Sequence, residues 1–76
     1  MKQRKYEARS NLIRLCDQLG VKFQEYGRGN HFRLFGETVV DYWPGTARAW
    51  KTGSLFKGEK MDAGDVVVWV KTGMKP

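Results

Sequence analysis

The chain has 76 residues and a formal net charge of +6, from 14 lysine and arginine residues against 8 aspartate and glutamate residues. This length predicts a single domain over residues 1–76, close to the lower limit at which one hydrophobic core is enough. A single cysteine rules out an internal disulfide framework, and with only one histidine besides we expect no metal ion and no cofactor.

The first predicted element is a helix over about residues 5–19, with Gly20 as its C-terminal cap. Its apolar stripe places Cys16 among leucines, which predicts a buried thiol rather than a reactive one. Its first half is basic and carries Arg4, Lys5 and Arg9. These three cations would add contacts to phosphates if the ligand of the chain is a nucleic acid. The stripe itself consists of Ala8, Leu12, Leu15, Cys16 and Leu19.

Alternating apolar and polar residues predict antiparallel strands over residues 21–26, 31–35 and 38–43, with 48–51 as a short fourth strand or an extension. Gly36-Glu37 fits a two-residue hairpin turn, and Pro44-Gly45 fits a type II turn. The alternation places His31 and Arg33 on one face of the second strand. Residues 52–60 are expected to form a mobile connection anchored by Phe56.

The last element has two interpretations. Residues 66–70 form a β-branched run that favours a strand. Asp62 followed by Asp65 resembles a helix start, and Gly73 fits a helix end. We predict a helix over about residues 63–72, with the strand as the alternative. Its apolar stripe would be Val66, Val67, Val70 and Met74, and Trp69, one position off that stripe, is expected to be partly exposed.

Together these elements predict an α+β domain of order α-β-β-β-α. Its antiparallel sheet would have three strands, or four if residues 48–51 pair, and both helices would pack on one face. The opposite face would then expose His31, Arg33 and aromatic side chains. The sequence leaves the oligomeric state open.

Part of the chain resembles the HicA-like toxins, which are small mRNA interferases with a double-stranded-RNA-binding-domain-like fold. The resemblance covers most of residues 11–45: a helix ending in Leu-Gly-Val, a strand, then GRGNHFRL and TVVDYWP. The toxins carry a catalytic histidine in a Gly-Ser-His turn, and the equivalent triplet here is Gly29-Asn30-His31. The resemblance implies a ribonuclease with His31 as general acid or base.

A second stretch, Val40-Asp41-Tyr42-Trp43-Pro44-Gly45-Thr46 followed by Trp50-Lys51, is similar to a segment of small uncharacterised phage and prophage proteins. This resemblance implies an accessory protein that acts on host or phage nucleic-acid machinery. No apolar stretch has the length of a signal peptide core or a membrane span, so we expect the chain in the cytoplasm of a bacterial host cell.

Aromatic residues lie next to cations between residues 42 and 51, a mixture in which rings stack on unpaired bases while cations hold phosphates. Packing of Trp43 and Trp50 into the core is the alternative. We therefore interpret the chain as a non-catalytic protein that binds nucleic acid, with RNA favoured, or a host nucleic-acid-processing protein. The candidate binding residues are Arg28, His31, Arg33, Arg48, Trp50, Lys51, Lys57 and Lys60.

Two other functions remain open from the sequence. One is the HicA-like ribonuclease with His31 as its catalytic residue. The other is a phage-encoded inhibitor that docks on a host protein through Trp43, Trp50 or Trp69, because exposed aromatic residues beside positive charge also describe a protein-binding surface.

Overall fold

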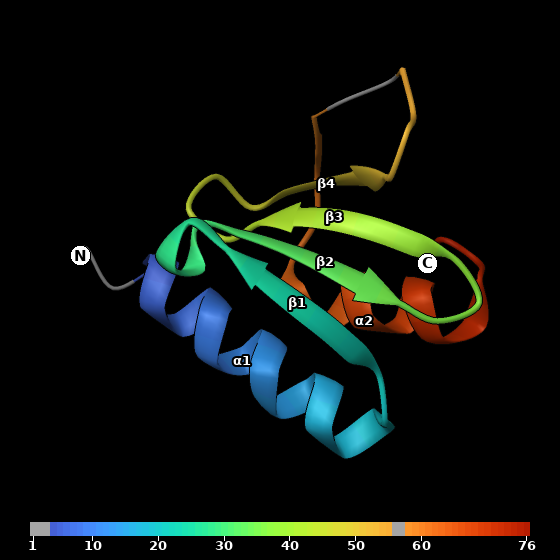
Figure 1. Cartoon of the computed structure of the whole chain (residues 1–76), viewed down its shortest axis with the longest axis horizontal. Helices are drawn as coiled ribbons and strands as arrows, with labels where there is room; N and C mark the ends of the chain where they lie inside the picture. The colour runs from blue at the N-terminus through green and yellow to red at the C-terminus, as the bar shows by residue number, and fades with distance from the viewer. Residues whose placement is uncertain (1–3, 56–57) are drawn as a thin grey trace.

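The computed structural model of the chain describes residues 4–55 and 58–76, with side chains from residue 7 onward in the first helix. It is an α+β domain (Figure 1), and five strands form one antiparallel sheet of order β1-β2-β3-β4-β5. In chain order the elements are α1 (Arg4–Leu19), β1 (Lys22–Tyr26), the 3-10 turn η1 (Gly27–Gly29), β2 (His31–Phe35), β3 (Val39–Trp43), β4 (Arg48–Lys51), β5 (Glu59–Lys60) and α2 (Ala63–Thr72).

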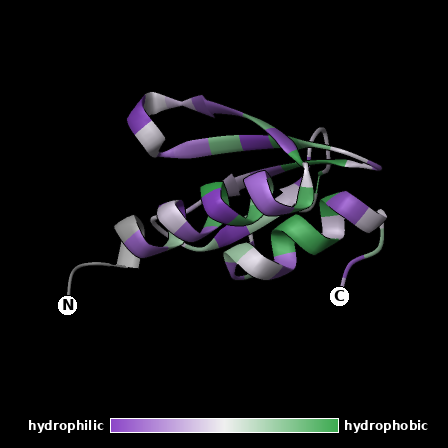
Figure 2. Cartoon of the chain, turned by 90° about the horizontal axis from the view of Figure 1, so that it is seen from below, coloured by the Kyte–Doolittle hydropathy of each residue, from purple (hydrophilic) through white to green (hydrophobic). Residues whose placement is uncertain are grey.

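Both helices lie on the same side of the sheet, as predicted, and contact each other (Figure 2). The predicted meander of three or four strands is extended by β5, which pairs with β4 through Arg48–Lys60 and Ala49–Glu59. Sequence periodicity could not indicate β5 because two residues do not establish an alternation. Phe56, the expected anchor of the connection before β5, lies outside the described residues.

The core lies between the sheet and the two helices. Phe32 and Leu34 of β2, together with Val40 and Tyr42 of β3, are fully buried on the helix side of the sheet. Because side chains alternate along a strand, the residues between these positions point to the other side. The helices cover the core with Leu12 and Cys16 from α1, and with Val66, Val67, Trp69 and Val70 from α2.

The helix α1 ends as its sequence predicts. Gly20 adopts φ 73, a left-handed conformation that costs glycine little, and the Val21 N–H donates to the Cys16 carbonyl at 2.8 Å. Cys16 is 1% exposed, and this burial raises the pKa of its thiol to about 11. The thiol therefore stays protonated near neutral pH, which confirms the prediction of a buried cysteine.

The α2 segment is a helix, and its caps explain why the β-branched run does not form a strand. The Asp65 N–H donates to the Asp62 carboxylate at 3.0 Å, which satisfies an N-terminal donor. At the other end Gly73 adopts φ 81, and its N–H donates to the Trp69 carbonyl at 2.7 Å.

Two expectations about the apolar side of α2 are wrong. Trp69 is only 6% exposed, because α2 packs against both α1 and the sheet and so buries a wider arc than the valine stripe. Its ring also lies under the Lys75 ammonium, which is 5.3 Å from the ring centroid. Met74 is 73% exposed, because the left-handed Gly73 ends the helix before it.

Two turns also differ from their predicted types. The connection between β2 and β3 has three residues, 36–38, rather than two, and it lies against α2: the Glu37 N–H donates to the Val70 carbonyl at 2.8 Å. In the turn after β3 the Thr46 N–H donates to the Trp43 carbonyl at 3.3 Å, but Gly45 lacks the positive φ of a type II turn. The left-handed residue is Ala47, with φ 56.

We expect Gly36→Ala to lower the free energy of unfolding by about 1–3 kcal/mol, because an added methyl group would overpack the contact with α2. A Cβ at Gly36 would lie 2.5 Å from the Val70 carbonyl oxygen and 2.8 Å from its Cγ1. Gly64→Ala is the matched control, since its Cβ would meet no atom closer than 3.6 Å. Urea denaturation should show Gly64→Ala unchanged or up to about 1 kcal/mol more stable. Equal effects of the two changes would contradict the close packing of the 36–38 connection.

Candidate nucleic-acid interface

The side of the sheet without helices is called the open face here. In an antiparallel sheet, directly paired residues point to the same side. The cross-strand pairs therefore show which residues share the open face. These pairs are Tyr26–His31, Arg33–Asp41, Asp41–Trp50, Trp43–Arg48 and Arg48–Lys60. The residues that this register places on the open face are Lys22, Gln24, Tyr26, His31, Arg33, Phe35, Val39, Asp41, Trp43, Arg48, Trp50 and Lys60.

Four rings on the open face form an aromatic ladder across β1, β2, β3 and β4, made of Tyr26, His31, Trp43 and Trp50. The His31 and Trp43 rings are stacked, with centroids 4.1 Å apart and planes 5° apart. Trp43 stacks on Trp50 with centroids 4.2 Å and planes 21° apart, and the Tyr26 and His31 centroids are 5.1 Å apart. Each such pair contributes about 0.5–1.5 kcal/mol beyond the area that it buries.

The ladder forms a ridge rather than a flat platform. Adjacent strands are about 4.8 Å apart, so rings from neighbouring strands with centroids about 4 Å apart stack along the direction that crosses the strands. Their planes therefore stand up from the sheet. The two faces of Trp43 contact His31 and Trp50, and solvent meets ring edges, which carry the positive end of the aromatic quadrupole. Tyr26, on the edge strand, is the most exposed ring, at 36%.

Below the ridge, the carboxylate of Asp41 joins three neighbouring side chains. Its Oδ1 lies 2.8 Å from Arg33 Nε, which donates to it, and 3.0 Å from His31 Nε2. Its Oδ2 accepts from the Thr52 hydroxyl at 3.1 Å. Asp41 is 5% exposed, and among the described residues it is the only buried charged side chain. These contacts fix His31 and Arg33 against β3.

The contacts also decide the ionisation of the cluster. Burial alone would raise the pKa of Asp41, but hydrogen bonds from Arg33, His31 and Thr52 outweigh it and hold this pKa below its ordinary value. The hydrogen bond to Asp41 in turn raises the pKa of Arg33. Arg33 thus stays charged, its side chain is 35% exposed, and its guanidinium carbon lies 5.8 Å from the Tyr26 ring centroid.

The open face carries more positive than negative charge. Its register holds four cations, Lys22, Arg33, Arg48 and Lys60, against the single carboxylate of Asp41. Lys22, Arg48 and Lys60 are exposed, and Arg48 also donates to the Gly58 carbonyl. Arg48 and Lys60 continue the row of Trp43 on β4 and β5, Arg33 lies beside the ladder on β2, and Lys22 lies at the other end of β1 from Tyr26. An anionic chain that crosses the ridge along this diagonal would therefore meet positive charge along its path.

The structure brings together five of the eight residues predicted as the binding site, namely His31, Arg33, Arg48, Trp50 and Lys60. Lys51 pairs with the buried Val40, so its side chain leaves the sheet on the helix side. Arg28 is exposed in the η1 turn with φ 59 and has no described contact with the ladder. Lys57 lies outside the described residues.

The helix cations predicted to add phosphate contacts do not join this face. Arg9 donates to the Glu25 carboxylate at 3.1 Å, and Glu25 pairs with Phe32 on the helix side of the sheet. The side chains of Arg4 and Lys5 lie outside the described residues. The expected alternative of Trp43 and Trp50 packing into the core is wrong, because both rings lie on the open face and are half-buried by stacking.

Sequence reasoning missed four residues of the site, which are Lys22, Tyr26, Asp41 and Thr52. Asp41 left a signal: a carboxylate within the run Val39-Val40-Asp41-Tyr42-Trp43 must face away from the core or be paired. Trp43, predicted as a core residue or a protein-docking residue, shares its alternation with Asp41 and lies in the ladder. Tyr26 and Thr52 carry no local signal, since their roles depend on cross-strand pairing.

Comparison with models of protein families, with curated proteins and with solved structures finds no match. The HicA-like and phage-protein resemblances thus remain predictions. Among residues 4–55 and 58–76, no group of three metal-ligating side chains is found, and no helix is long and apolar enough to cross a membrane. The fold and this surface define a small α+β domain whose open sheet face combines stacked rings with cations.

We expect Asp41→Asn to lower the free energy of unfolding by about 2–3 kcal/mol at neutral pH, because the charged acceptor of three hydrogen bonds is lost. Asp17→Asn, which neutralises an exposed carboxylate on α1, is the control and should change stability by less than about 0.5 kcal/mol. Urea denaturation of the three proteins measures both effects. A small effect of Asp41→Asn would show that the cluster does not stabilise the fold.

The effect of Asp41→Asn should also depend on pH. The folded pKa of Asp41 is lowered, so its stabilisation is complete above the unfolded value of about 3.9 and is lost as the pH falls through the folded value. We expect the difference between the wild type and Asp41→Asn to stay constant from pH 7 to about pH 5 and to shrink below pH 4. A difference that persists unchanged to about pH 2 would contradict the lowered pKa.

Proposed function

We propose that this chain is a non-catalytic nucleic-acid-binding domain, that its binding surface is the open face, and that its preferred ligand is single-stranded RNA. The observation that carries this proposal is the aromatic ladder flanked by exposed cations. Single-stranded nucleic acid offers both complements of such a surface, phosphates for the cations and unpaired bases for the rings.

Ring orientation determines how an RNA strand would contact this surface. Because Trp43 is enclosed by His31 and Trp50, a base cannot lie flat on it, and its contacts must be with ring edges. Positive ring edges favour the oxygen acceptors of phosphates, sugars and bases. Tyr26 and the Arg33 guanidinium beside it form the more open end of the ridge, where one unpaired base has room to stack.

The charge pattern favours a polyanion over an acidic protein patch. The cations stand on β1, β2, β4 and β5, on a diagonal that crosses the sheet from Lys22 to Lys60 and moves along the strands as it does so. Asp41 neutralises Arg33 only in part, because Asp41 is also bound to His31 and Thr52. A chain with regularly spaced phosphates can contact all of these positions at once.

We expect RNA affinity to fall steeply with salt. If four cations contact phosphates of a single strand, the slope of log K against log salt concentration is about −3, which is a roughly fiftyfold loss between 50 and 200 mM salt. The triple variant Lys22→Gln, Arg48→Gln, Lys60→Gln should reduce the magnitude of the slope by about 2. Fluorescence anisotropy with a labelled single-stranded RNA measures the slopes.

The matched control removes the same number of charges from the helix side, with Arg9→Gln, Lys51→Gln and Lys71→Gln, none of which lines the open face. It has the same net charge as the first triple variant and should keep the wild-type slope. Equal losses in the two triple variants would show binding by net charge alone and would reject the open face as the site. If the wild-type chain does not bind RNA but retains one host protein in a pull-down after nuclease treatment, the inhibitor function is favoured instead.

A second function is favoured by one contact, between His31 Nε2 and the Asp41 carboxylate at 3.0 Å. A carboxylate that fixes one imidazole nitrogen orients the ring for acid–base chemistry at the other, and the Arg33 guanidinium lies on the same carboxylate. This arrangement is the one that a HicA-like ribonuclease using His31 would need. The binding proposal explains the contact between His31 and Asp41 differently: the carboxylate holds the imidazole ring in its stack on Trp43.

Metal-free incubation with labelled RNA distinguishes the two functions. The binding proposal predicts intact RNA with the wild-type protein and weakened binding, without any other change, for His31→Ala. A general acid or base is worth about 10²–10⁴-fold in rate, so a ribonuclease would show cleavage that His31→Ala nearly abolishes. Cleavage of this kind, followed on the gel used for binding, would replace the binding proposal.

A further inference from the structure

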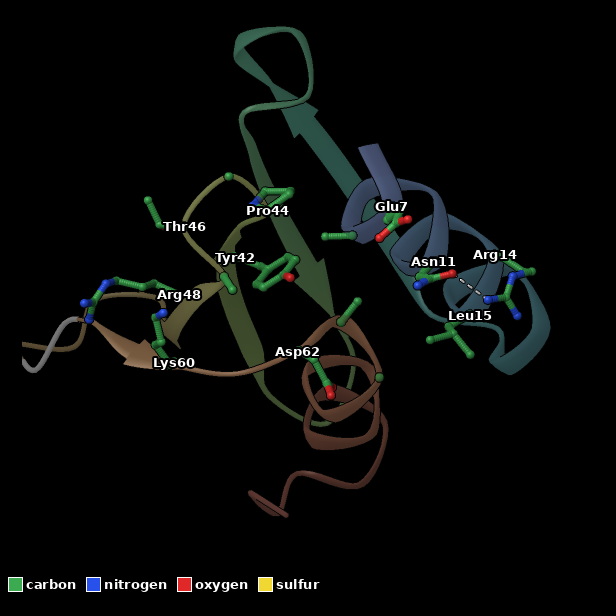
Figure 3. A pocket seen from close by; sticks show the side chains of 15 residues that line it. Glu7, Asn11, Arg14, Leu15, Tyr42, Pro44, Thr46, Arg48, Lys60 and Asp62 are labelled. Atoms are coloured by element: carbon green, nitrogen blue, oxygen red, sulfur yellow. Dashed lines mark hydrogen bonds between the residues drawn. The ribbon is translucent and has the colours of Figure 1, made fainter. Parts of the chain in front are cut away.

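A hollow of about 760 Å³ lies on the side of the domain opposite the ladder, where α1, the 44–47 turn and the start of α2 meet (Figure 3). This volume is in the range of sites that hold small ligands, about 300–1,000 Å³. Its apolar wall includes Leu15, Pro44 and Ala63. At one end Arg48 and Lys60 line it, and these two residues also belong to the open face.

The wall of this hollow contains an unpaired polar atom. Tyr42 is fully buried, yet its hydroxyl has no hydrogen-bond partner among the described residues. The hydroxyl points toward the space between the sheet and α1 (Figure 3). Buried polar groups nearly always have a partner, so one that has none needs an explanation. An acceptor supplied by a ligand in the hollow would provide the missing partner.

The chemistry of the hollow limits what that ligand can be. Burial raises the pKa of Tyr42 to about 12, with a further contribution from the charge of Asp62, so the hydroxyl remains a donor near neutral pH. A matching ligand needs an acceptor at Tyr42, an apolar flat body against Pro44 and Leu15, and an anionic group at Arg48 and Lys60. A nucleobase carrying a phosphate has these three features in one molecule.

We propose that the hollow holds one unpaired nucleotide, with its base against Tyr42 and its phosphate on Arg48 and Lys60. This inference rests on the proposed function, because the same two cations would hold the backbone of an RNA strand on the open face. Alternation along β3 places Trp43 on the open face and the adjacent Tyr42 on the helix side, where it lines the hollow. A strand that passes the end of β3 and β4 could then insert one nucleotide into the hollow.

The test uses the whole chain and the four nucleoside 5′-monophosphates, with binding followed by amide chemical shifts in NMR. We expect shifts for residues around the 44–47 turn and the start of α2. Tyr42→Phe, which removes only the hydroxyl, should weaken binding of the preferred nucleotide about three- to tenfold through the lost hydrogen bond. Ser10→Ala is the control, because it removes an exposed hydroxyl of α1 that does not line the hollow, and it should leave this binding unchanged.

Folding of the Tyr42→Phe variant gives a second readout. An unpartnered hydroxyl adds nothing to stability, so the urea midpoint should stay the same or rise. A lowered midpoint would reveal a partner within the folded chain and would overturn the inference. Equal binding of inorganic phosphate and of the nucleotides, with no effect of Tyr42→Phe, would also overturn it by leaving a phosphate site only.

The two proposals fail separately. RNA binding that depends on the open-face cations, without nucleotide shifts in the hollow, would reject the nucleotide site and retain the RNA-binding surface. Nucleotide binding in the hollow that is sensitive to Tyr42→Phe, without any RNA binding by the chain, would reject the open face and retain the hollow as a site for a free nucleotide. In the second case Lys60→Gln should weaken nucleotide binding, because Lys60 lines the hollow, while Lys71→Gln, which does not line it, should leave the binding unchanged.

Discussion

The buried carboxylate of Asp41 organises the centre of the open face of the sheet. A charge with 5% exposure is costly unless donors surround it, and here a guanidinium, an imidazole and a hydroxyl all reach it. These three groups come from β2 and from the residue that follows β4, so one side chain on β3 joins two other segments to its own strand. Through its contact with His31, Asp41 also fixes the imidazole ring that lies between Tyr26 and Trp43 in the stack.

The two faces of the sheet are stabilised in different ways. On the helix side, apolar side chains from β2, β3 and both helices form a closed core, which provides the hydrophobic stabilisation of a 76-residue chain. Two short helices can cover only that one face. The open face is therefore held by stacking, cation–π contacts and hydrogen bonds, all of which leave polar edges in contact with solvent. The residues proposed to bind RNA can therefore occupy it without weakening the core.

The end of β3 and β4 connects the open face to the hollow on the other side. Residues 42 and 43 are adjacent in the chain, yet a two-residue side-chain period directs the buried Tyr42 hydroxyl to one side and the Trp43 ring to the other. Arg48 and Lys60 border both regions because the sheet ends there. Under the two proposals above, a single RNA strand would contact both regions and would combine backbone recognition on the face with selection of one base in the hollow.

Local signals in the sequence determined the helices and the face that each strand residue occupies. The Asp62 and Gly73 caps act within a few residues, and the alternation of His31, Phe32, Arg33 and Leu34 follows from strand geometry alone. Only the tertiary structure decided the partners: Asp41 meets side chains 8 to 11 residues away, and the ladder depends on the register of four strands. The same reason explains the burial of Trp69 and the pairing of β5, because each depends on how distant segments pack, and no local propensity encodes that packing.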